Sequence, residues 1–453
     1  MSKTIKIRKG LNIPILGGSE KIVQTASRAA LYALKPTDFH GLIPKMLVKE
    51  GDTVRAGSPL FYDKYNEKVL FTSPVSGVFH EVVRGAKRRI LGVVVKPDEN
   101  DTFVDFGAAN PSTLSRQEIV DKLLSSGCWP FIRQRPFSII ASPQNQPRDI
   151  FVSAFSTSPL AIDLDLVVAG NETYFQTGLD VLAKLTKGKV HLSIDSNNTR
   201  SKAFIDAKNV EIHKFCGPHP AGNVGIQIHH VSPINKGEIV WYADVQDIVV
   251  IGKLFQTGQF DATRVVALSG SEVIAPKYYR TKIGAQVNSI TEGKLVEETG
   301  IVKRLISGDV LTGTKVETTG FLGFYHGQIS VIPEGYEPQM FGWIAPNFNR
   351  FSISRTFPSF LFPGKKYRHD TNIRSGERAF VFTGVYEKVL PMDVMPMQLL
   401  KAILVNDIDK MEQLGIYEVA PEDFALCEYV CPSKIDIQDL IWQGLDSIRA
   451  EFA

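Results

Sequence analysis

Cys427 and Cys431 have the spacing of thiolates that bind a metal cluster. They lie in the segment CEYVCP, and a Cys-x-x-x-Cys-Pro run is how a set of cluster ligands can end. A [4Fe–4S] centre needs four thiolates, whereas the other two cysteines, Cys128 and Cys216, are isolated in sequence. We therefore expect no iron–sulfur site and no disulfide framework. This cysteine usage fits a reducing cytoplasm.

The histidines form no recognisable metal-binding motif. The chain has nine of them, and neither an HExxH motif nor a paired Cys/His spacing surrounds the group His213, His219, His229 and His230. We interpret these four as structural histidines. The sequence also shows no nucleophile elbow and no Cys/His catalytic motif, so we predict no catalytic residue.

A nucleotide-binding loop is missing where the sequence would place one. A dinucleotide site needs Gly-x-Gly-x-x-Gly between a strand and a helix, because bare backbone amides must approach the pyrophosphate. The predicted strand 150–154 is followed by FSTSPL, and the predicted strand 164–169 is followed by GNET. We therefore expect no NADH site of the standard kind.

Residues 49–95 have the pattern of a small sandwich of short strands. Short apolar alternations are separated by Gly and Pro turns, as in the biotinyl/lipoyl carrier hammerhead. A working carrier needs a lysine in a motif like Met-Lys-Met at its hairpin tip, which falls near Asn66. Neither Lys64 nor Lys68 is flanked by Met. We expect the carrier fold without the attached group.

The composition is that of an ordinary globular chain. Its 453 residues are 43% hydrophobic and 22% charged, which allows several domains of ~100–200 residues each. The net charge of +3 is too small to predict nucleic-acid binding. Residues 1–12 lack the apolar region of a signal peptide, and no apolar run approaches the ~18–20 residues of a membrane span. The sequence predicts a soluble protein that reaches a membrane only through a partner.

Strands and helices alternate after residue 111. Ser115 and Glu118 form a predicted capping box at the start of a helix, and Gly127 suits the position after its end. Apolar runs predict strands at 150–154, 164–169, 190–195, 210–215 and 247–252. Helical spacing occurs at 175–187, 397–404, 407–414 and 437–452. The alternation indicates an open α/β sheet with Rossmann-like crossovers.

The predicted fold class is multidomain α/β. An N-terminal region with a biotinyl/lipoyl-like β-hammerhead occupies residues 1–105, and a Rossmann-like α/β domain without a nucleotide loop occupies 106–254. A β-grasp (SLBB-like) unit follows at 255–335. An aromatic-rich connecting segment follows at 336–390, of which 341–362 is expected to pack between domains, and a C-terminal helical domain closes the chain at 391–453.

The full set of segments resembles the A subunits of the sodium-translocating NADH:quinone oxidoreductase, a bacterial respiratory pump. The resemblance covers nearly the whole chain. Its segments are KGLNIPI (9–15), FTSPVSG (71–77), RGAKR (84–88), FIRQRPFS (131–138), GPHPAG (217–222), FGW (341–343) and LCEYVCP (426–432). The family in turn is similar to the flavoprotein subunit of complex I and to the C subunit of the Rnf complex, which would explain the domain order.

Departures from those more distant relatives concern their cofactors. Where they have a Gly-Arg-Gly-Gly-Ala-Gly-Phe-Pro flavin loop, this chain has SGCWPF at 126–131, and where they have an acidic run it has STSP at 156–159. Their cluster cysteines are reduced here to Cys427 and Cys431, the relic of an iron–sulfur site. The resemblance therefore implies a subunit with no FMN, no NADH site, no iron–sulfur cluster and no covalently bound cofactor.

The resemblance also implies a location and partners. We expect a peripheral subunit on the cytoplasmic face of the bacterial inner membrane, bound to the other subunits of the pump, membrane subunits included, and not to nucleic acid. The complex couples NADH-to-quinone electron transfer to Na⁺ export, and quinone is the expected ligand or substrate here. The isolated subunit is not expected to oxidise NADH. The alternatives are a purely structural role in assembly, without a ligand, and an electron carrier like the Rnf C subunit.

Two segments offer the mixture that a quinone site requires. A quinone headgroup is flat and apolar with two carbonyl acceptors, so its site needs aromatic walls and convergent donors. The predicted quinone-binding residues are Tyr32, Phe39, His40, Trp129, Phe131, Arg133, Arg135 and Phe137. The alternative is that the rings belong to the core and that the two arginines pair with carboxylates.

The purified subunit should be colourless and unmodified. Its absorbance spectrum should show neither flavin bands nor an iron–sulfur shoulder after reconstitution, because the loop and the cysteines are missing. Its intact mass should equal that of the sequence, because Lys64 and Lys68 lack the neighbours that a carrier lysine needs. A biotinyl or lipoyl adduct at either lysine would contradict the interpretation of the hammerhead.

Overall fold

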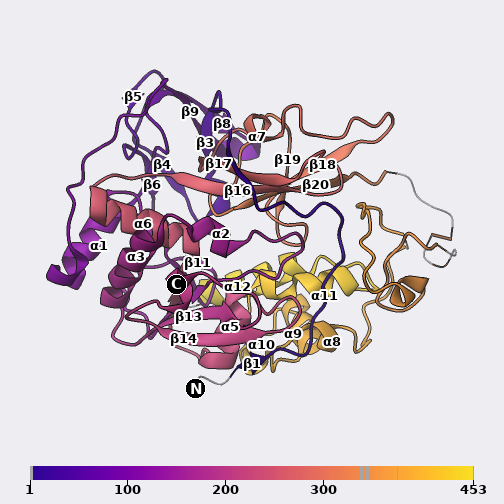
Figure 1. Ribbon diagram of the computed structural model, residues 1–453. Helices are drawn as coiled ribbons and strands as arrows, with labels where there is room; N and C mark the ends of the chain where they lie inside the picture. The colour runs from indigo at the N-terminus through magenta and orange to yellow at the C-terminus, as the bar shows by residue number, and fades with distance from the viewer. Residues whose placement is uncertain (1–3, 337–340, 343, 345–346, 375, 452–453) are drawn as a thin grey trace.

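The computed structural model describes residues 4–336, 341–342, 344, 347–374 and 376–451. An N-terminal β module and a six-stranded sheet lie along one side of the molecule, and a seven-stranded sheet and the C-terminal helices lie along the other (Figure 1). The mixed α/β multidomain fold that the sequence predicts is therefore observed.

Two small sheets share one core in the N-terminal module. Their strand orders are β3-β9-β8-β5 and β4-β6-β7. The strands are β3 Tyr32–Leu34, β4 Pro44–Met46, β5 Thr53–Val54, β6 Pro59–Asp63, β7 Asn66–Thr72, β8 Gly77–Arg84 and β9 Ile90–Pro97. The hairpin between β6 and β7 turns at Lys64 and Tyr65, and the ring of Tyr65 is exposed. This is the tip at which a carrier would hold its lysine.

The seven-stranded sheet has the order β1-β14-β13-β12-β15-β10-β11. Its strands are β1 Ile5–Lys6, β10 Arg133–Arg135, β11 Ile139–Ile140, β12 Ile150–Ser153, β13 Val190–Asp195, β14 Glu211–Cys216 and β15 Val240–Tyr242. All strands from β1 to β15 in this order pair in parallel, and β10 and β11 are antiparallel. Side chains alternate along β12: Ile150 and Val152 face the main core, and Phe151 faces the core formed with helix α5 (Val224–Val231).

Six helices accompany this sheet. They are α1 Arg116–Ser125, α2 Leu164–Val168, α3 Glu172–Leu185, α4 Lys202–Ile205, α5 Val224–Val231 and α6 Val245–Thr257. The predicted capping box begins α1, because Ser115 accepts from the Glu118 amide while the Glu118 carboxylate accepts from the Ser115 amide. Gly127 follows the helix with φ of +74°. The predicted helix at 175–187 is α3.

Two predicted strands are helices in the structure. Residues 164–168 form α2, whose N-cap Asp163 accepts from the amide of Leu166, and residues 247–252 lie inside α6. Every residue from Val245 to Gly252 is buried, so α6 carries no polar stripe in that stretch. A short apolar run without a polar stripe has the same pattern in a buried helix and in a buried strand. That ambiguity explains the wrong prediction at 247–252.

The six-stranded sheet has the order β19-β18-β20-β16-β17-β2. Its strands are β2 Val23–Thr25, β16 Thr263–Ser269, β17 Lys277–Lys282, β18 Lys303–Ser307, β19 Thr314–Val316 and β20 Gln328–Pro333, with the short helix α7 Asn288–Thr291 against it. The sheet has a core of its own that includes Val266, Leu268, Ile290 and Ile329.

The first strands of the chain join later domains. β1 pairs with β14 and β2 with β17, so neither belongs to the two sheets of the N-terminal module. Ile7, Ile13 and Ile15 are buried in the core of the C-terminal helices. Residues 5–25 therefore connect three domains, although the sequence places them in one N-terminal region.

The C-terminal domain is helical, as predicted. Its helices are α8 Tyr386–Val389, α9 Pro396–Leu404, α10 Ile408–Gln413, α11 Ala425–Val430 and α12 Ile437–Glu451, and a short 3₁₀ turn at Pro421–Phe424 precedes α11. Among the residues that the structure describes, no helix is long and apolar enough to cross a membrane.

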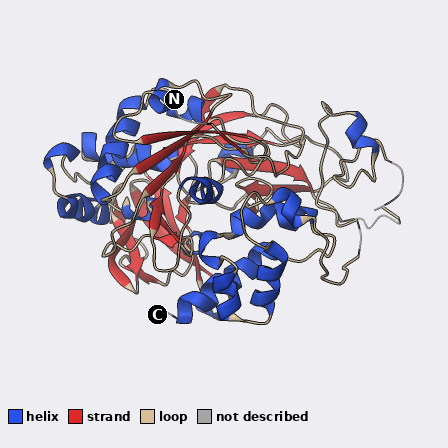
Figure 2. Cartoon of the chain, turned by 90° about the horizontal axis from the view of Figure 1, so that it is seen from below, coloured by secondary structure: helices blue, strands red, loops and turns tan. Residues whose placement is uncertain are grey.

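Most of the described aromatic rings at 341–362 are exposed and do not pack between domains as predicted, whereas Tyr367 and Tyr386 farther along the segment are buried. Phe341, Phe348 and Phe360 are more than half exposed, and the segment projects from one end of the molecule (Figure 2). Arg368 holds it to the six-stranded sheet through a bidentate ion pair with Glu272. An aromatic-rich composition predicts contact surface, but it does not say whether the surface is covered by the same chain. Trp343 lies outside the described residues.

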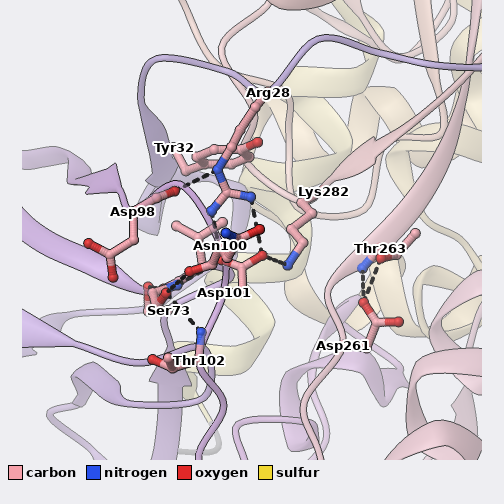
Figure 3. A network of polar contacts seen from close by, with 12 residues as sticks. Arg28, Tyr32, Ser73, Asp98, Asn100, Asp101, Thr102, Asp261, Thr263 and Lys282 are labelled. Carbon is pink, nitrogen blue, oxygen red and sulfur yellow. Dashed lines mark hydrogen bonds and ion pairs between the residues drawn. The ribbon is translucent and has the colours of Figure 1, made fainter.

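Asp101 connects the N-terminal module to the six-stranded sheet (Figure 3). Its carboxylate accepts from the Arg28 guanidinium at 2.8 Å, from the Lys282 ammonium at 2.5 Å and from the Ser76 amide at 3.0 Å. Burial alone would raise the pKa of Asp101. The hydrogen bonds and charges of Arg28 and Lys282 outweigh burial and lower this pKa from 3.8 to about 2.

We expect Asp101→Asn to lower the free energy of unfolding by about 1–2 kcal/mol at pH 7, after allowance for the partial exposure of the pair. Because the folded-state pKa is depressed, the ionised carboxylate stabilises the wild type above pH 4. That contribution is lost as the pH falls from 4 to 2. Urea unfolding at pH 7 and at pH 3 measures both effects.

Asp98→Asn is the matched control, because Asp98 is exposed and only its backbone carbonyl bonds Arg28. The difference between wild type and Asp101→Asn should shrink at pH 3. A difference that is the same at both pH values would contradict the assignment of this pKa.

Candidate functional site

A cavity of about 250 Å³ opens at the carboxyl ends of β12 and β15. From β12 the chain crosses to β13 and β14 on one side, and it then returns to place β15 on the other side. The strand order therefore reverses between β12 and β15. In open α/β sheets this reversal leaves a crevice beyond the strand ends, and ligands bind there.

Three domains form the walls of this cavity. The seven-stranded sheet contributes the loops after β12, β14 and β15, the six-stranded sheet contributes the turns after β18 and before β20, and the C-terminal domain contributes one carboxylate. Residues that line it include Arg133, Ser153, Phe155, Ile162, Leu164, His219, Val224, Tyr242, Asp244, Asp309, Tyr325, His326, Gln328 and Glu422. The lining mixes apolar side chains with a few donors and acceptors.

His219 has a buried ring nitrogen without a partner. Its Nδ1 lies 3.1 Å from the hydroxyl of Thr157, which also accepts from the amide of Gly222. When the Thr157 hydroxyl donates its proton to Nδ1, the hydrogen of His219 lies on Nε2. Nε2 is buried and has no protein partner within the described residues. Burial lowers the pKa of His219 to about 4, so the ring is neutral at pH 7.

His326 repeats this arrangement from the other sheet. Its Nδ1 lies 2.8 Å from the hydroxyl of Ser307, and that hydroxyl accepts from the amide of Gly323. When the Ser307 hydroxyl donates its proton to Nδ1, the hydrogen of His326 lies on Nε2. Burial lowers the pKa of His326, so this ring is neutral as well. Two neutral histidine rings from two different domains thus line the cavity.

Arg133 supplies a positive charge between two rings. Its guanidinium carbon lies 4.5 Å from the centre of the Tyr242 ring and 4.3 Å from that of Tyr325, and Nη2 bonds Asp244 at 2.7 Å. Burial opposes the charge, but the carboxylate of Asp244 outweighs it and the pKa of Arg133 is raised. Nε of Arg133 has no protein partner in the described part of the chain.

Most of the predicted quinone-binding residues lie away from this cavity. Tyr32, Phe39, Trp129 and Phe131 are 3% exposed or less. The ring centres of Phe39 and Phe131 lie 4.8 Å and 4.9 Å from that of Phe324, so the two predicted segments do meet. They meet as packed core, and their ring faces are covered by other side chains.

Three others also have protein partners. His40 stacks on Trp442 at 3.8 Å, and Phe137 packs against Tyr417. Arg135 has no exposed surface and pairs with two carboxylates of the C-terminal domain. Of the eight predicted residues, Arg133 alone lines the cavity.

Sequence reasoning missed both histidine donors. His219 lies in the segment GPHPAG, which carries the family resemblance, so its position was available as a signal. His326 lies in FYHGQ, where nothing in the sequence distinguishes it. Each depends on a hydroxyl far away in the chain, and a motif search cannot find such a pair.

The cysteine pair at the C-terminus is buried among the helices. Cys427 and Cys431 have no exposed surface, and the Tyr386 hydroxyl lies 3.0 Å from the sulfur of Cys431. Burial raises the pKa of Cys427, which disfavours a thiolate. In the described ranges neither cysteine belongs to a group of three ligating side chains. The arrangement fits the predicted buried thiols.

Comparison with known proteins matches three family models to successive parts of the chain. The NqrA N-terminal barrel-sandwich hybrid domain matches residues 5–98, the NqrA second alpha/beta domain 114–260, and the NQRA C-terminal domain 265–318. These matches agree with a barrel sandwich, an α/β domain and an SLBB-like domain in that order.

Relatives that match nearly the whole chain point to the same family as the three domain models. The A subunit of the Na(+)-translocating NADH-quinone reductase of Rhodopirellula baltica is 40% identical over 454 residues, covering 98% of each chain. Its counterpart from Yersinia pestis bv. Antiqua is 40% identical over 452 residues, covering 99% of this chain and 100% of its own. A crystal structure of an air-oxidized NAD⁺-reducing [NiFe]-hydrogenase aligns with a TM-score of 0.37 at 12% identity, over 76% of this chain and 64% of its own, too distant to bear on function.

We expect the double variant Cys427→Ser, Cys431→Ser to keep electron-transfer activity in the assembled complex. Its unfolding free energy should fall by about 1–2 kcal/mol, an ordinary cost for a change of packing. Turnover and thermal unfolding of the purified complex measure the two effects. Loss of electron transfer in a fully assembled variant complex would show that the pair is functional.

Proposed function

The chain belongs to the NqrA family, the A subunits of the Na(+)-translocating NADH-quinone reductase, and from this premise we propose that its cavity binds the headgroup of a quinone. As a member of this family it is one subunit of an enzyme complex. The proposal concerns what this subunit itself contributes to that complex.

The two histidine donors are the observation that supports the proposal most strongly. A quinone is uncharged and has two carbonyl oxygens, each of which accepts a hydrogen bond. His219 and His326 line one cavity, both rings are neutral at pH 7, and each offers an N–H donor when its hydrogen lies on Nε2. Neutral donors suit a neutral acceptor, whereas a carboxylate or phosphate ligand would call for paired cations.

The remaining lining fits a flat ring that is partly apolar. Phe155, Ile162 and Val224 supply apolar contact, and the stacked set of Tyr242, Arg133 and Tyr325 supplies planar groups beside it. Pockets of this composition, with few convergent polar groups, are typical of small-molecule sites. Arg133, the one predicted residue that lines the cavity, keeps its role in this proposal.

The proposal extends to the setting of the subunit. We place it, without FMN, NADH or iron–sulfur sites of its own, on the cytoplasmic face of the inner membrane, bound to the membrane subunits of the complex. Here the quinone site would serve electron transfer that is coupled to Na⁺ export. Support for this setting comes from the resemblance and from the missing loops and cysteines in the sequence.

His219→Leu and His326→Leu test the site. Each replaces one hydrogen-bond donor by an apolar side chain of similar size. Each should therefore lower the affinity for a soluble quinone analogue about tenfold, which corresponds to about 1.4 kcal/mol of binding free energy. The measurement is a fluorescence or calorimetric titration of the purified chain, with circular dichroism to check the fold.

His40→Leu is the matched control, because His40 stacks on Trp442 at the surface and does not line the cavity. It should bind the analogue as the wild type does. If both cavity variants retain wild-type affinity, the proposed site is wrong. If the wild type binds no analogue at all, a purely structural role for the subunit is favoured.

A further inference from the structure

Three side chains that could ligate a metal meet on one face of the seven-stranded sheet. They lie near the starts of β13 and β14, at the opposite end of the strands from the cavity. In the parallel register His191 pairs with Glu211 and Ser193 with His213, so these residues share a face. The ligand atoms of His191, Glu211 and His213 lie within 4.8 Å of one another. All three stand in the first half of their strands, whereas the cavity lies beyond the carboxyl ends of the sheet.

We propose that His191, His213 and Glu211 form a binding site for a divalent transition-metal ion of the zinc class. Two imidazoles and a carboxylate are a ligand set that binds Zn²⁺ with a fourth position left to water. Nδ1 of His191 and Nε2 of His213 are 2.9 Å apart. Two nitrogens that ligate one tetrahedral zinc at ~2.0–2.1 Å would be about 3.3 Å apart. A small movement of one ring is enough to admit the ion.

His191 is already oriented for this role. Its Nε2 faces the carboxylate of Asp149 at 3.6 Å, and its ring stacks on Phe151 with ring centres 4.6 Å apart. A carboxylate behind the second ring nitrogen is the usual outer partner of a ligating histidine, because it fixes the tautomer whose other nitrogen binds the metal. Here that other nitrogen is Nδ1, which points toward His213.

The ring contact also suits a metal. Nδ1 of His191 and Nε2 of His213 share one hydrogen bond, so one of these two nitrogens carries the hydrogen. When His191 carries its hydrogen on Nε2, toward Asp149, the shared hydrogen belongs to Nε2 of His213. Metal binding then requires the other neutral tautomer of His213, with the hydrogen on Nδ1, and this exchange releases no net proton.

Glu211 must exchange one partner for another. Its carboxylate now pairs with the ammonium of Lys189 at 2.5 Å, and both side chains are largely exposed. An exposed ion pair of this kind contributes little, so its loss costs little. Lys189 therefore competes weakly with the metal, and its removal should favour metal binding.

A metal here would join β13 to the first half of β14. β1 pairs with Phe215 and Cys216 only, so the outer edge of β14 at Glu211 and His213 has no partner strand among the described residues. An ion that bridges the two strands would stabilise this open end of the sheet. His230 lines the same hollow, and its Nδ1 is bonded to the carbonyl of Ile226.

The test is Zn²⁺ titration of the full-length chain without a histidine tag, by calorimetry, with Co²⁺ absorbance as a probe of tetrahedral coordination. The wild type should bind one Zn²⁺ per chain, and its melting temperature should rise with added Zn²⁺. His191→Ala and His213→Ala should each abolish both effects. Asp149→Asn should weaken binding about 10–100-fold, and Lys189→Gln should strengthen it.

His80→Ala is the control, since His80 is an exposed histidine of β8 in another domain. It should bind Zn²⁺ as the wild type does. The proposal is overturned if the wild type fails to bind Zn²⁺, or if His191→Ala and His213→Ala, both still folded by circular dichroism, bind it unchanged. Weaker binding in Lys189→Gln would also contradict the assignment of Glu211 as a ligand.

Discussion

A buried guanidinium requires a carboxylate beside it, and in this protein such pairs join separate domains. Arg135 of β10 has no exposed surface and bonds Glu422 at 2.7 Å and Asp423 at 3.1 Å, both in the C-terminal domain. Arg264 of β16 bonds Asp247 of α6 at 2.5 Å, and both are buried. Removing one member of such a pair leaves an uncompensated charge that costs about 3–5 kcal/mol. The domains that surround the cavity are therefore held in one arrangement, and its donors keep their places.

The sequence predicts correctly those elements that depend on residues close together in the chain. The capping box of Ser115 and Glu118 and the positive φ of Gly127 depend on neighbours a few residues away, and both are observed. The helix α6 was misread because its environment, not its sequence, makes it a helix. Gly178 of α3 lies so close to Ile248 that a Cβ would meet its carbonyl oxygen at 2.2 Å. This close approach of α3 buries α6 on almost every side from Val245 to Gly252. A helix in such surroundings needs no polar face, so its sequence lacks the polar stripe that would identify it as a helix.

The family could be predicted from the sequence, but the site could not. Aromatic and basic residues between prolines are equally typical of a ligand pocket and of a core, and Phe131 illustrates the second outcome, with no exposed surface. His219 can present Nε2–H to the cavity because Thr157 lies against the other ring nitrogen. Contacts of this kind join residues that are far apart in the chain, so the residues beside each of them in sequence do not indicate the contact. The same holds for His191 and His213, which adjacent strands bring together.

The placement of the first strands has a consequence for synthesis on the ribosome. Ile5 pairs with Phe215, and Val23 pairs with Tyr278. At ~5–20 residues per second, the partner strands leave the exit tunnel roughly 10–50 s after these segments do. The earliest part of the nascent chain thus waits with unpaired backbone and with Ile7, Ile13 and Ile15 uncovered, because the core that buries them is translated last. The N-terminal module can close from its own strands during that interval, whereas the seven-stranded sheet needs β15, which ends at Tyr242, and the six-stranded sheet needs β20, which ends at Pro333.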